Sequence, residues 1–286
     1  MRLATLETAE GFKAVAVHGS RYVDLHAADA GLPSALREIL AADPDLQRTR
    51  AAAHDGAERG LFITGRLSAP IARPEKVICI GLNYRDHALE SGVEPPAEPI
   101  CFSKFSQSVV GPEDAIRLPA VCQQVDYEAE LVVVIGRRGR KISRADAYNY
   151  VAGYMNGNDV SARDWQLQKP GKQWLMGKTP DTFAPTGPWI VTRDEVPDPA
   201  KLPIMLRLNG ALMQNSSTAE LIFGVDEVIA YMSQLITFEP GDLIFTGTPP
   251  GVGMARKPPV FLKPGDVTEV EIAGFGVLRN PVIADD

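Results

Sequence analysis

Three carboxylates occupy alternate positions just ahead of a short apolar run, as Asp126, Glu128 and Glu130 followed by Leu131 to Ile135. The run is rich in β-branched residues, so we expect a strand. Side chains of a strand alternate between its two faces, so the three carboxylates should point the same way. Carboxylates at the start of a buried strand repel each other unless a positive group compensates them. A divalent cation with oxygen ligands is one candidate, and a solvated strand end is the alternative.

A polar segment farther along the chain contains another carboxylate, Asp159, which could complete an oxygen shell with Glu128 and Glu130. Three carboxylates suit Mg²⁺ or Mn²⁺, because hard cations prefer oxygen ligands. Arg163 in the same segment could bind a substrate carboxylate through its planar fork. The alternative is a capping turn with a structural arginine. The four histidines show no metal-ligand spacing, which argues against zinc.

A histidine and a glutamate share one face of a short helix expected from Tyr84 to Ser91. His87 and Glu90 are three residues apart. A carboxylate beside an imidazole orients it and raises its basicity, so the pair could take a proton from water. The alternative is a surface histidine in a local ion pair.

Two further segments could handle negative charge. Lys178 stands between glycine and threonine and could stabilise a developing enolate, although a lone lysine is more commonly a surface residue. The segment from Thr246 to Gly253 follows an expected strand, and its N–H groups and hydroxyls, including those of Gly247 and Thr248, could bind a carboxylate. The alternative is a tight turn. The segment lacks a phosphate-binding signature, so nucleotide binding is not indicated.

The composition excludes several classes of partner. The chain has 286 residues and a net charge of −7, without the basic excess typical of nucleic-acid binding. It has no apolar stretch near the ~18 residues that a membrane span needs. The three cysteines show no CxxC spacing, and the N-terminus lacks the apolar core of a signal peptide. We therefore expect reduced thiols and a cytoplasmic protein.

The elements that must position these residues fall into two parts. Residues 1–70 begin with short alternating segments typical of a small antiparallel sheet, followed by a helical stretch from Leu32 to Ala53. Residues 71–286 are mainly strands and turns, with helices expected at Tyr84 to Ser91, Arg144 to Tyr150 and Val225 to Leu235. Strands and helices do not alternate regularly, which favours a β-rich α+β fold with a small N-terminal domain.

Taken together and in order, these segments resemble the fumarylacetoacetate hydrolase family, in its branch of acylpyruvate hydrolases and oxaloacetate decarboxylases. The resemblance runs from about Lys76 to Pro281 and rests on Gly81-Leu82-Asn83-Tyr84 with His87 and Glu90, Asp126 to Glu130, Asn158 to Asp164, Gly177-Lys178-Thr179, Asn209-Gly210 and Thr246 to Gly253. It implies a mixed β-sandwich roll fold and a homodimer.

The resemblance also assigns roles to the site residues. It implies one Mg²⁺ or Mn²⁺ per subunit, held by Glu128, Glu130 and Asp159. It makes His87 and Glu90 a catalytic dyad and places the catalytic Lys178 against the substrate. The residues expected to bind substrate are Arg163, Gln166, Gly247 and Thr248.

The expected chemistry starts from a 2-oxo or 1,3-diketo acid whose carboxylate and keto oxygens chelate the cation. Our leading hypothesis is a metal-dependent hydrolase that cleaves a C–C bond of acylpyruvate-like acids. The alternative is a lyase, decarboxylase or isomerase of the same family, acting on oxaloacetate, ureidoglycolate or a sugar-derived keto acid. A third hypothesis is a binder of metal or small acids without turnover. Fold alone does not choose among these reactions.

Overall fold

The computed structural model describes residues 1–285, with all side chains except those of Ser91 and Lys172. Its strands are β1 (Arg2–Thr8), β2 (Gly11–His18), β3 (Arg21–Asp24), β4 (Phe62–Ile63), β5 (Arg66–Ser68), β6 (Val77–Gly81), β7 (Ile100–Lys104), β8 (Val109–Val110), β9 (Ile116–Leu118), β10 (Val125–Asp126), β11 (Ala129–Ile135), β12 (Val151–Asn158), β13 (Ser161–Ala162), β14 (Ala184–Thr192), β15 (Pro203–Leu208), β16 (Ala211–Ser217), β17 (Leu243–Phe245), β18 (Val267–Ile272) and β19 (Val277–Ala284).

The α-helices are α1 (Leu25–Ala28), α2 (Leu36–Ala42), α3 (Gln47–Glu58), α4 (Arg85–Ser91), α5 (Arg163–Leu167), α6 (Leu175–Lys178) and α7 (Val225–Met232). Short 3₁₀ helices are η1 (Ser106–Ser108), η2 (Arg144–Tyr150), η3 (Pro170–Lys172), η4 (Arg193–Glu195), η5 (Thr218–Glu220) and η6 (Gly253–Ala255). The helix expected from Arg144 to Tyr150 is therefore a 3₁₀ helix. Among residues 1–285, no helix has the length and apolar character needed to cross a bilayer.

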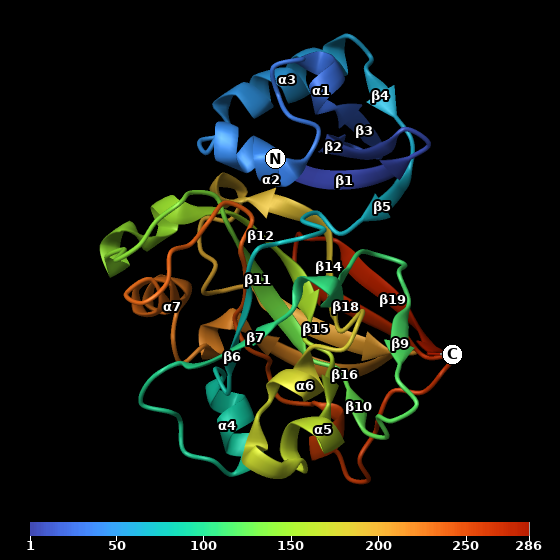
Figure 1. The fold of residues 1–286 in the computed structure, drawn as a ribbon, viewed down its shortest axis with the longest axis vertical. Coiled ribbons are helices and arrows are strands. Elements are labelled where there is room, and N and C mark those ends of the chain that lie inside the picture. Colours follow the sequence, from blue (N-terminus) through green and yellow to red (C-terminus); the bar gives the residue numbers. More distant parts are fainter. Residues whose placement is uncertain (286) are drawn as a thin grey trace.

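The N-terminal part, drawn in blue in Figure 1, covers one end of the molecule. Its predicted antiparallel sheet is confirmed, because β1, β2 and β3 pair in sequence order. The helical stretch predicted from Leu32 to Ala53 is instead two helices, α2 and α3. Pro44 lies between them and cannot continue the helical hydrogen bonds. The Asp43 carboxylate then accepts from the Thr49 N–H at 2.7 Å, inside the first turn of α3.

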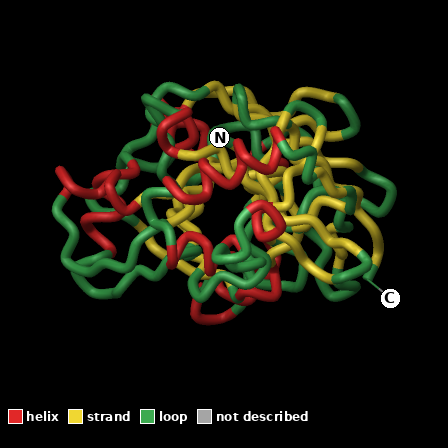
Figure 2. Tube along the Cα trace, turned by 90° about the horizontal axis from the view of Figure 1, so that it is seen from above, coloured by secondary structure: helices red, strands yellow, loops and turns green. Residues whose placement is uncertain are grey.

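One sheet runs through the whole molecule in the order β4-β3-β2-β1-β14-β12-β11-β17-β6-β7. Its N-terminal strands join the rest through β1, which pairs antiparallel with β14 and sets Leu3 opposite Ile190. A second sheet, β16-β15-β18-β19-β9, packs against β11, β12 and β14. Seen from above, strands gather on the side that carries the C-terminus (Figure 2).

Strand β11 lies in the interior of the long sheet, between β12 and β17, and is buried at every position. Its alternate side chains enter different cores: Leu131 and Val133 pack between the two sheets, whereas Val132 and Val134 face the core shared with the N-terminal part. Burial on both faces explains the unbroken apolar run in the sequence. The β-rich mixed fold is confirmed. The boundary near residue 70 stays a prediction.

Candidate active site

Glu128, Glu130 and Asp159 meet where β11 begins and β12 ends. Ala129 pairs with Asn158 across these strands, so Glu128 and Asp159 lie just outside the paired region. The Asp159 N–H donates to the Glu128 carbonyl oxygen at 2.9 Å and holds the two turns together. One carboxylate oxygen from each of the three lies within 4.8 Å of the others, and all three residues are buried.

Asp126 is not part of this triad. Its carboxylate accepts the N–H groups of Gly253 at 2.7 Å and Met254 at 3.0 Å, and it forms an ion pair of 2.9 Å with Arg163. The alternation predicted through Asp126 fails because β10 and β11 are separate strands, interrupted at Tyr127 and Glu128. Asp126 therefore anchors Arg163 and a neighbouring loop.

Two cations compensate Glu128. Lys178 Nζ donates to Glu128 Oε2 at 2.7 Å and to Asp159 Oδ2 at 2.8 Å. Arg163 Nη2 lies 2.7 Å from Glu128 Oε1. Burial favours the neutral acid, but Lys178 and Arg163 outweigh burial and lower the pKa of Glu128 to about 2. Glu128 is thus held ionised at neutral pH.

The carboxylate charge of Glu130 has fewer compensating partners than that of Glu128. Its Oε2 accepts the Gly247 N–H at 2.7 Å, and among residues 1–285 no cation forms an ion pair with it. Burial, and then the charges of Asp159 and Glu128, raise the pKa of Glu130 well above its usual range. A divalent cation at the three converging oxygens would relieve this cost. The all-carboxylate donor set fits Mg²⁺ or Mn²⁺.

A cation that sequence reasoning missed lies beneath the triad. Lys104 ends β7, its side chain is fully buried, and its Nζ lies 2.6 Å from Asp159 Oδ1. Burial lowers the pKa of Lys104, and Asp159 opposes that effect. A lone lysine at the end of a strand carries no sequence signal that separates it from a surface lysine. With Asp126 included, four buried carboxyl groups therefore face three cations.

The His87–Glu90 pair lies on α4, as the spacing predicts. His87 Nδ1 is 3.1 Å from Glu90 Oε2. Glu90 in turn accepts the Gly251 N–H, at 2.9 Å and 3.1 Å to its two oxygens. The loop after β17 thus fixes the carboxylate that orients the imidazole.

A cavity of about 90 Å³ joins these groups. It is lined by Ile80, Gly81, Leu82, His87, Phe102, Glu128, Glu130, Asp159, Arg163, Gln166, Trp174, Lys178 and Thr248. Glu90 and Gly247 lie behind the wall, in contact with His87 and Glu130 respectively. The structure thus brings the predicted site residues together, while their individual roles stay predictions. Sequence reasoning missed the apolar wall of Phe102 and Trp174, whose rings pack edge to face at 5.4 Å.

All four residues expected to bind substrate already have protein partners, and Gly247 donates its N–H to Glu130. Arg163 contacts Asp126 and Glu128 and also donates from Nη1 to Gln166 Oε1 at 3.0 Å. The Thr248 hydroxyl donates to the Ala129 carbonyl at 3.0 Å. In this arrangement Arg163 holds Glu128, and Lys178 holds both Glu128 and Asp159.

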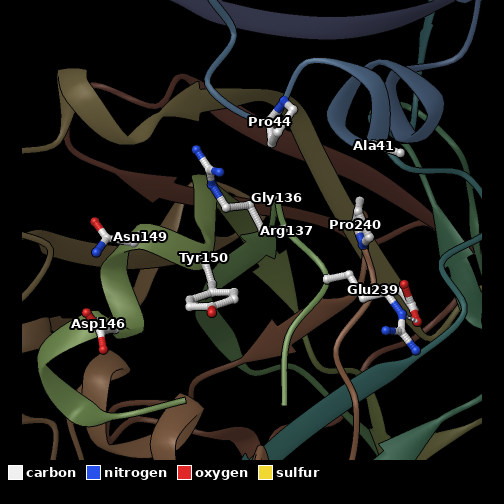
Figure 3. Close-up of a pocket in the computed structure, with 10 residues that line it drawn as sticks. Ala41, Pro44, Gly136, Arg137, Asp146, Asn149, Tyr150, Glu239 and Pro240 are labelled. Atoms are coloured by element: carbon white, nitrogen blue, oxygen red, sulfur yellow. Dashed lines mark hydrogen bonds and ion pairs between the residues drawn. The ribbon is translucent and has the colours of Figure 1, made fainter. Parts of the chain in front are cut away.

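A separate cavity of about 640 Å³ lies between the end of α2 and the loop after β11 (Figure 3). Ala41 and Pro44 contribute from the N-terminal part, and Tyr150 forms part of the opposite wall. Its guanidinium groups are already paired, Arg137 with Asp45 and Arg138 with Glu239. None of the predicted site residues lines this cavity.

Comparison with known proteins defines the class. Residues 76–283 match the family described as Fumarylacetoacetate (FAA) hydrolase C-terminal. The chain is 51% identical over 266 residues to Oxaloacetate tautomerase fahd2, mitochondrial, of Xenopus laevis, which covers 93% of this chain and 83% of that protein. It is 47% identical over 270 residues to Oxaloacetate tautomerase FAHD2A, mitochondrial, of Homo sapiens, with 93% and 85% covered. The chain therefore belongs to the fumarylacetoacetate hydrolase family.

One solved structure matches this chain over the full length of both proteins. Fumarylacetoacetate hydrolase from Exiguobacterium antarcticum is 35% identical, with a TM-score of 0.85 and 100% of each chain covered. The predicted family and fold are confirmed, and the family consists of enzymes. The two relatives named above are called tautomerases, so these comparisons do not favour acylpyruvate hydrolysis over the other reactions of the family.

The predicted cytoplasmic location is wrong. The relatives at 51% and 47% identity are named mitochondrial. The prediction rested on unpaired cysteines and on the lack of a secretory segment. These features argue only against the oxidising secretory route, so they did not favour the cytoplasm over other reducing compartments.

Proposed function

We propose that this protein interconverts the keto and enol forms of a small 2-oxo acid of the oxaloacetate type. The observation that carries the proposal is the cavity, where a histidine and a lysine face three carboxylates in about 90 Å³. Sites for drug-sized ligands enclose roughly 300–1,000 Å³, so this cavity suits a substrate of few heavy atoms. The names of the relatives from Xenopus laevis and Homo sapiens support the same substrate.

Glu128, Glu130 and Asp159 would hold one Mg²⁺ or Mn²⁺. When bound, the cation supplies Lewis-acid stabilisation of negative charge that develops on the 2-oxo oxygen. The Lys178 ammonium lies beside two of these carboxylates and adds positive charge on the same side of the cavity. Arg163 keeps Glu128 ionised and oriented.

His87 is the proposed proton carrier. With Nδ1–H donated to Glu90, the Nε2 lone pair of the neutral ring is free to accept a proton. His87 takes the proton from the carbon next to the oxo group, and the electron pair forms the carbon–carbon double bond of an enolate. The imidazolium then returns the proton to oxygen and gives the enol. The reverse reaction uses the same groups, and no water is consumed.

Hydrolysis of an acylpyruvate is the second candidate. Here His87 would take a proton from water, and the water oxygen would bond to the distal carbonyl carbon. The C–C bond would then break to release a carboxylic acid and the enolate of pyruvate, which would take up the proton from His87. The observation that favours it is the His87–Glu90 contact of 3.1 Å, which suits a general base. The solved relative from Exiguobacterium antarcticum is named a hydrolase. Decarboxylation of oxaloacetate would need the enolate stabilisation alone.

One panel of assays separates these reactions. Enol oxaloacetate, acylpyruvates and ureidoglycolate are given to the protein with Mg²⁺, Mn²⁺ or EDTA, and uncatalysed rates are subtracted. We expect metal-dependent loss of enol absorbance without carbon dioxide release. We also expect Glu128→Gln to abolish that activity. Enol loss at the uncatalysed rate, together with rapid acylpyruvate cleavage, would overturn the tautomerase in favour of the hydrolase.

A further inference from the structure

Lys104 has the most enclosed side chain of the three cations near the triad. It is the last residue of β7, its side chain is fully buried, and it does not line the cavity. Burying an ammonium without compensation is costly, so its contacts must offset that cost. The contacts identify what this residue does.

The Lys104 ammonium joins three separate segments of the chain. Its Nζ donates to the backbone carbonyls of Val160 and Phe183, each at 2.9 Å, and to the carbonyl of Lys178. It also lies 2.6 Å from Asp159 Oδ1. One nitrogen therefore ties the turn after β12, the end of α6 and the approach to β14.

These segments carry two groups of the proposed chemistry, Asp159 and Lys178. Lys104 forms an ion pair with Oδ1 of Asp159, while Oδ2 accepts a hydrogen bond from Lys178. A neighbouring contact tightens the same junction, because the Phe105 N–H donates to Thr179 Oγ1 at 2.7 Å. The end of β7 is thus fastened to the end of α6 at two points.

We propose that Lys104 is a positioning residue, which sets the orientation of the Asp159 carboxylate and the placement of the Lys178 backbone. The inference rests on the proposed metal site. Partners that orient metal ligands typically change affinity by about 10–100-fold when they are removed. Lys104 does not touch the cavity, so it acts through Asp159 and Lys178 and not on substrate.

The sign of the change in metal affinity separates this role from simple charge balance. If Lys104 only neutralised Asp159, its removal would leave the site more negative and would tighten cation binding. If Lys104 orients Asp159, its removal frees the carboxylate to rotate, and binding weakens although the site is more negative. Mn²⁺ affinity therefore tests the proposal directly.

The experiment titrates full-length wild type, Lys104→Met and Lys104→Gln with Mn²⁺ by calorimetry, with the electron spin resonance of bound Mn²⁺ as a second readout. Lys76→Met is the matched control. Lys76 Nζ lies 3.0 Å from the buried Asp242 Oδ2, so the variant loses a lysine–aspartate pair that does not line the cavity. For both Lys104 variants we expect about 10–100-fold weaker Mn²⁺ binding than in wild type, and a changed electron spin resonance spectrum of the bound ion. Binding in the Lys76 variant should match wild type.

Each outcome decides one question. Mn²⁺ binding by the Lys104 variants as tight as in wild type, or tighter, overturns the positioning role and leaves the metal site standing. Wild type that does not bind Mn²⁺ overturns both proposals. If neither Lys104 variant folds, hydrogen exchange on wild type decides: Mn²⁺ should slow exchange in β7 and α6. Protection confined to residues 128–130 and 158–160 would overturn the proposal.

Discussion

Asp159 is held by two lysines through different oxygens, Lys104 through Oδ1 and Lys178 through Oδ2. Lys178 differs because it lines the cavity and also binds Glu128. Its ammonium binds one carboxylate oxygen of Glu128 and one of Asp159, two of the residues that would hold a cation. The two lysines should therefore affect metal binding in opposite directions.

Lys178→Met should tighten Mn²⁺ binding while turnover falls. Removing a competing ammonium worth about 1 kcal/mol corresponds to roughly fivefold higher affinity. The lost charge beside the developing enolate should lower kcat by about 10²–10³-fold. Calorimetry and the enol assay measure the two effects. Weaker Mn²⁺ binding in this variant would show that Lys178 supports the site and does not compete with the cation.

Glu130→Gln should stabilise the metal-free protein. The folded-state pKa of Glu130 is raised, so this buried carboxyl costs stability at pH values above its ordinary pKa, and the cost falls as the pH is lowered. Glutamine resembles the protonated acid and can still accept the Gly247 N–H. In EDTA we expect Tm to rise by a few degrees, with a smaller gain as the pH falls. Mn²⁺ binding should be lost. A lower Tm in EDTA at neutral pH would contradict the assignment.

At the scale of elements, α4 depends on the loop after β17. Gly251 donates the N–H that holds Glu90, and its backbone has a φ of 99°, in the region that favours glycine. A Cβ at Gly251 would lie 2.2 Å from the Met213 carbonyl oxygen, so the loop would have to move. The position of His87 on α4 therefore depends on the position of this loop.

Gly251→Ala should lower kcat by about 10²-fold, because a displacement of about 1 Å at a reacting group has that effect. Mn²⁺ affinity should stay near wild type, since the triad lies where β11 begins and β12 ends and not on this loop. Gly265→Ala is the matched control, with a φ of 96° and no atom within 4 Å of the added Cβ. Equal kcat values in the two alanine variants would contradict the prediction that this loop positions Glu90 for catalysis.

Local pattern predicted several elements of the fold. The β-branched run of β11, the antiparallel segments of the N-terminal part and the short helix α4 are each defined by neighbouring residues. The pairing of β1 with β14 was not predictable, because it joins segments almost 190 residues apart. A period-two pattern predicts a strand but does not indicate which other strand pairs with it. The break between α2 and α3 had a signal, Pro44, that the alanine-rich composition outweighed.

The site was predictable where residues close in sequence act together. Glu128 and Glu130 share a strand start, and His87 and Glu90 share a helix. Lys104 was not predictable, because its partners lie at Asp159, Lys178 and Phe183, far along the chain. The pairing of Arg163 with Asp126 was missed for the same reason.

At the scale of the molecule, residues 71–285 should not be stable alone. Without β1, strand β14 would present an open edge, and Ile190 would lose its contact with the N-terminal core. We expect the truncated chain to aggregate during size-exclusion chromatography, whereas full-length protein stays dispersed. A monodisperse truncated chain with wild-type Mn²⁺ affinity would instead support an independent domain boundary near residue 70.

The homodimer also stays a prediction. Leu89 and Leu235 are each 82% exposed, and such side chains on the larger part could be covered by a second copy. Light scattering at micromolar concentration should give twice the chain mass of 30.9 kDa. A mass of one chain would rule the dimer out.

The sheet that runs from β4 to β7 links the two parts of the chain thermodynamically. Heating should give one calorimetric peak, because β1 and β14 cannot separate without exposing the core they share. A ligand that binds only the folded state moves such a peak as a whole, by about 2.7 kcal/mol of stabilisation at a hundredfold excess over its Kd. Mn²⁺ bound at Glu128 would thus protect β2 and β3 against heat, although neither strand contacts the site.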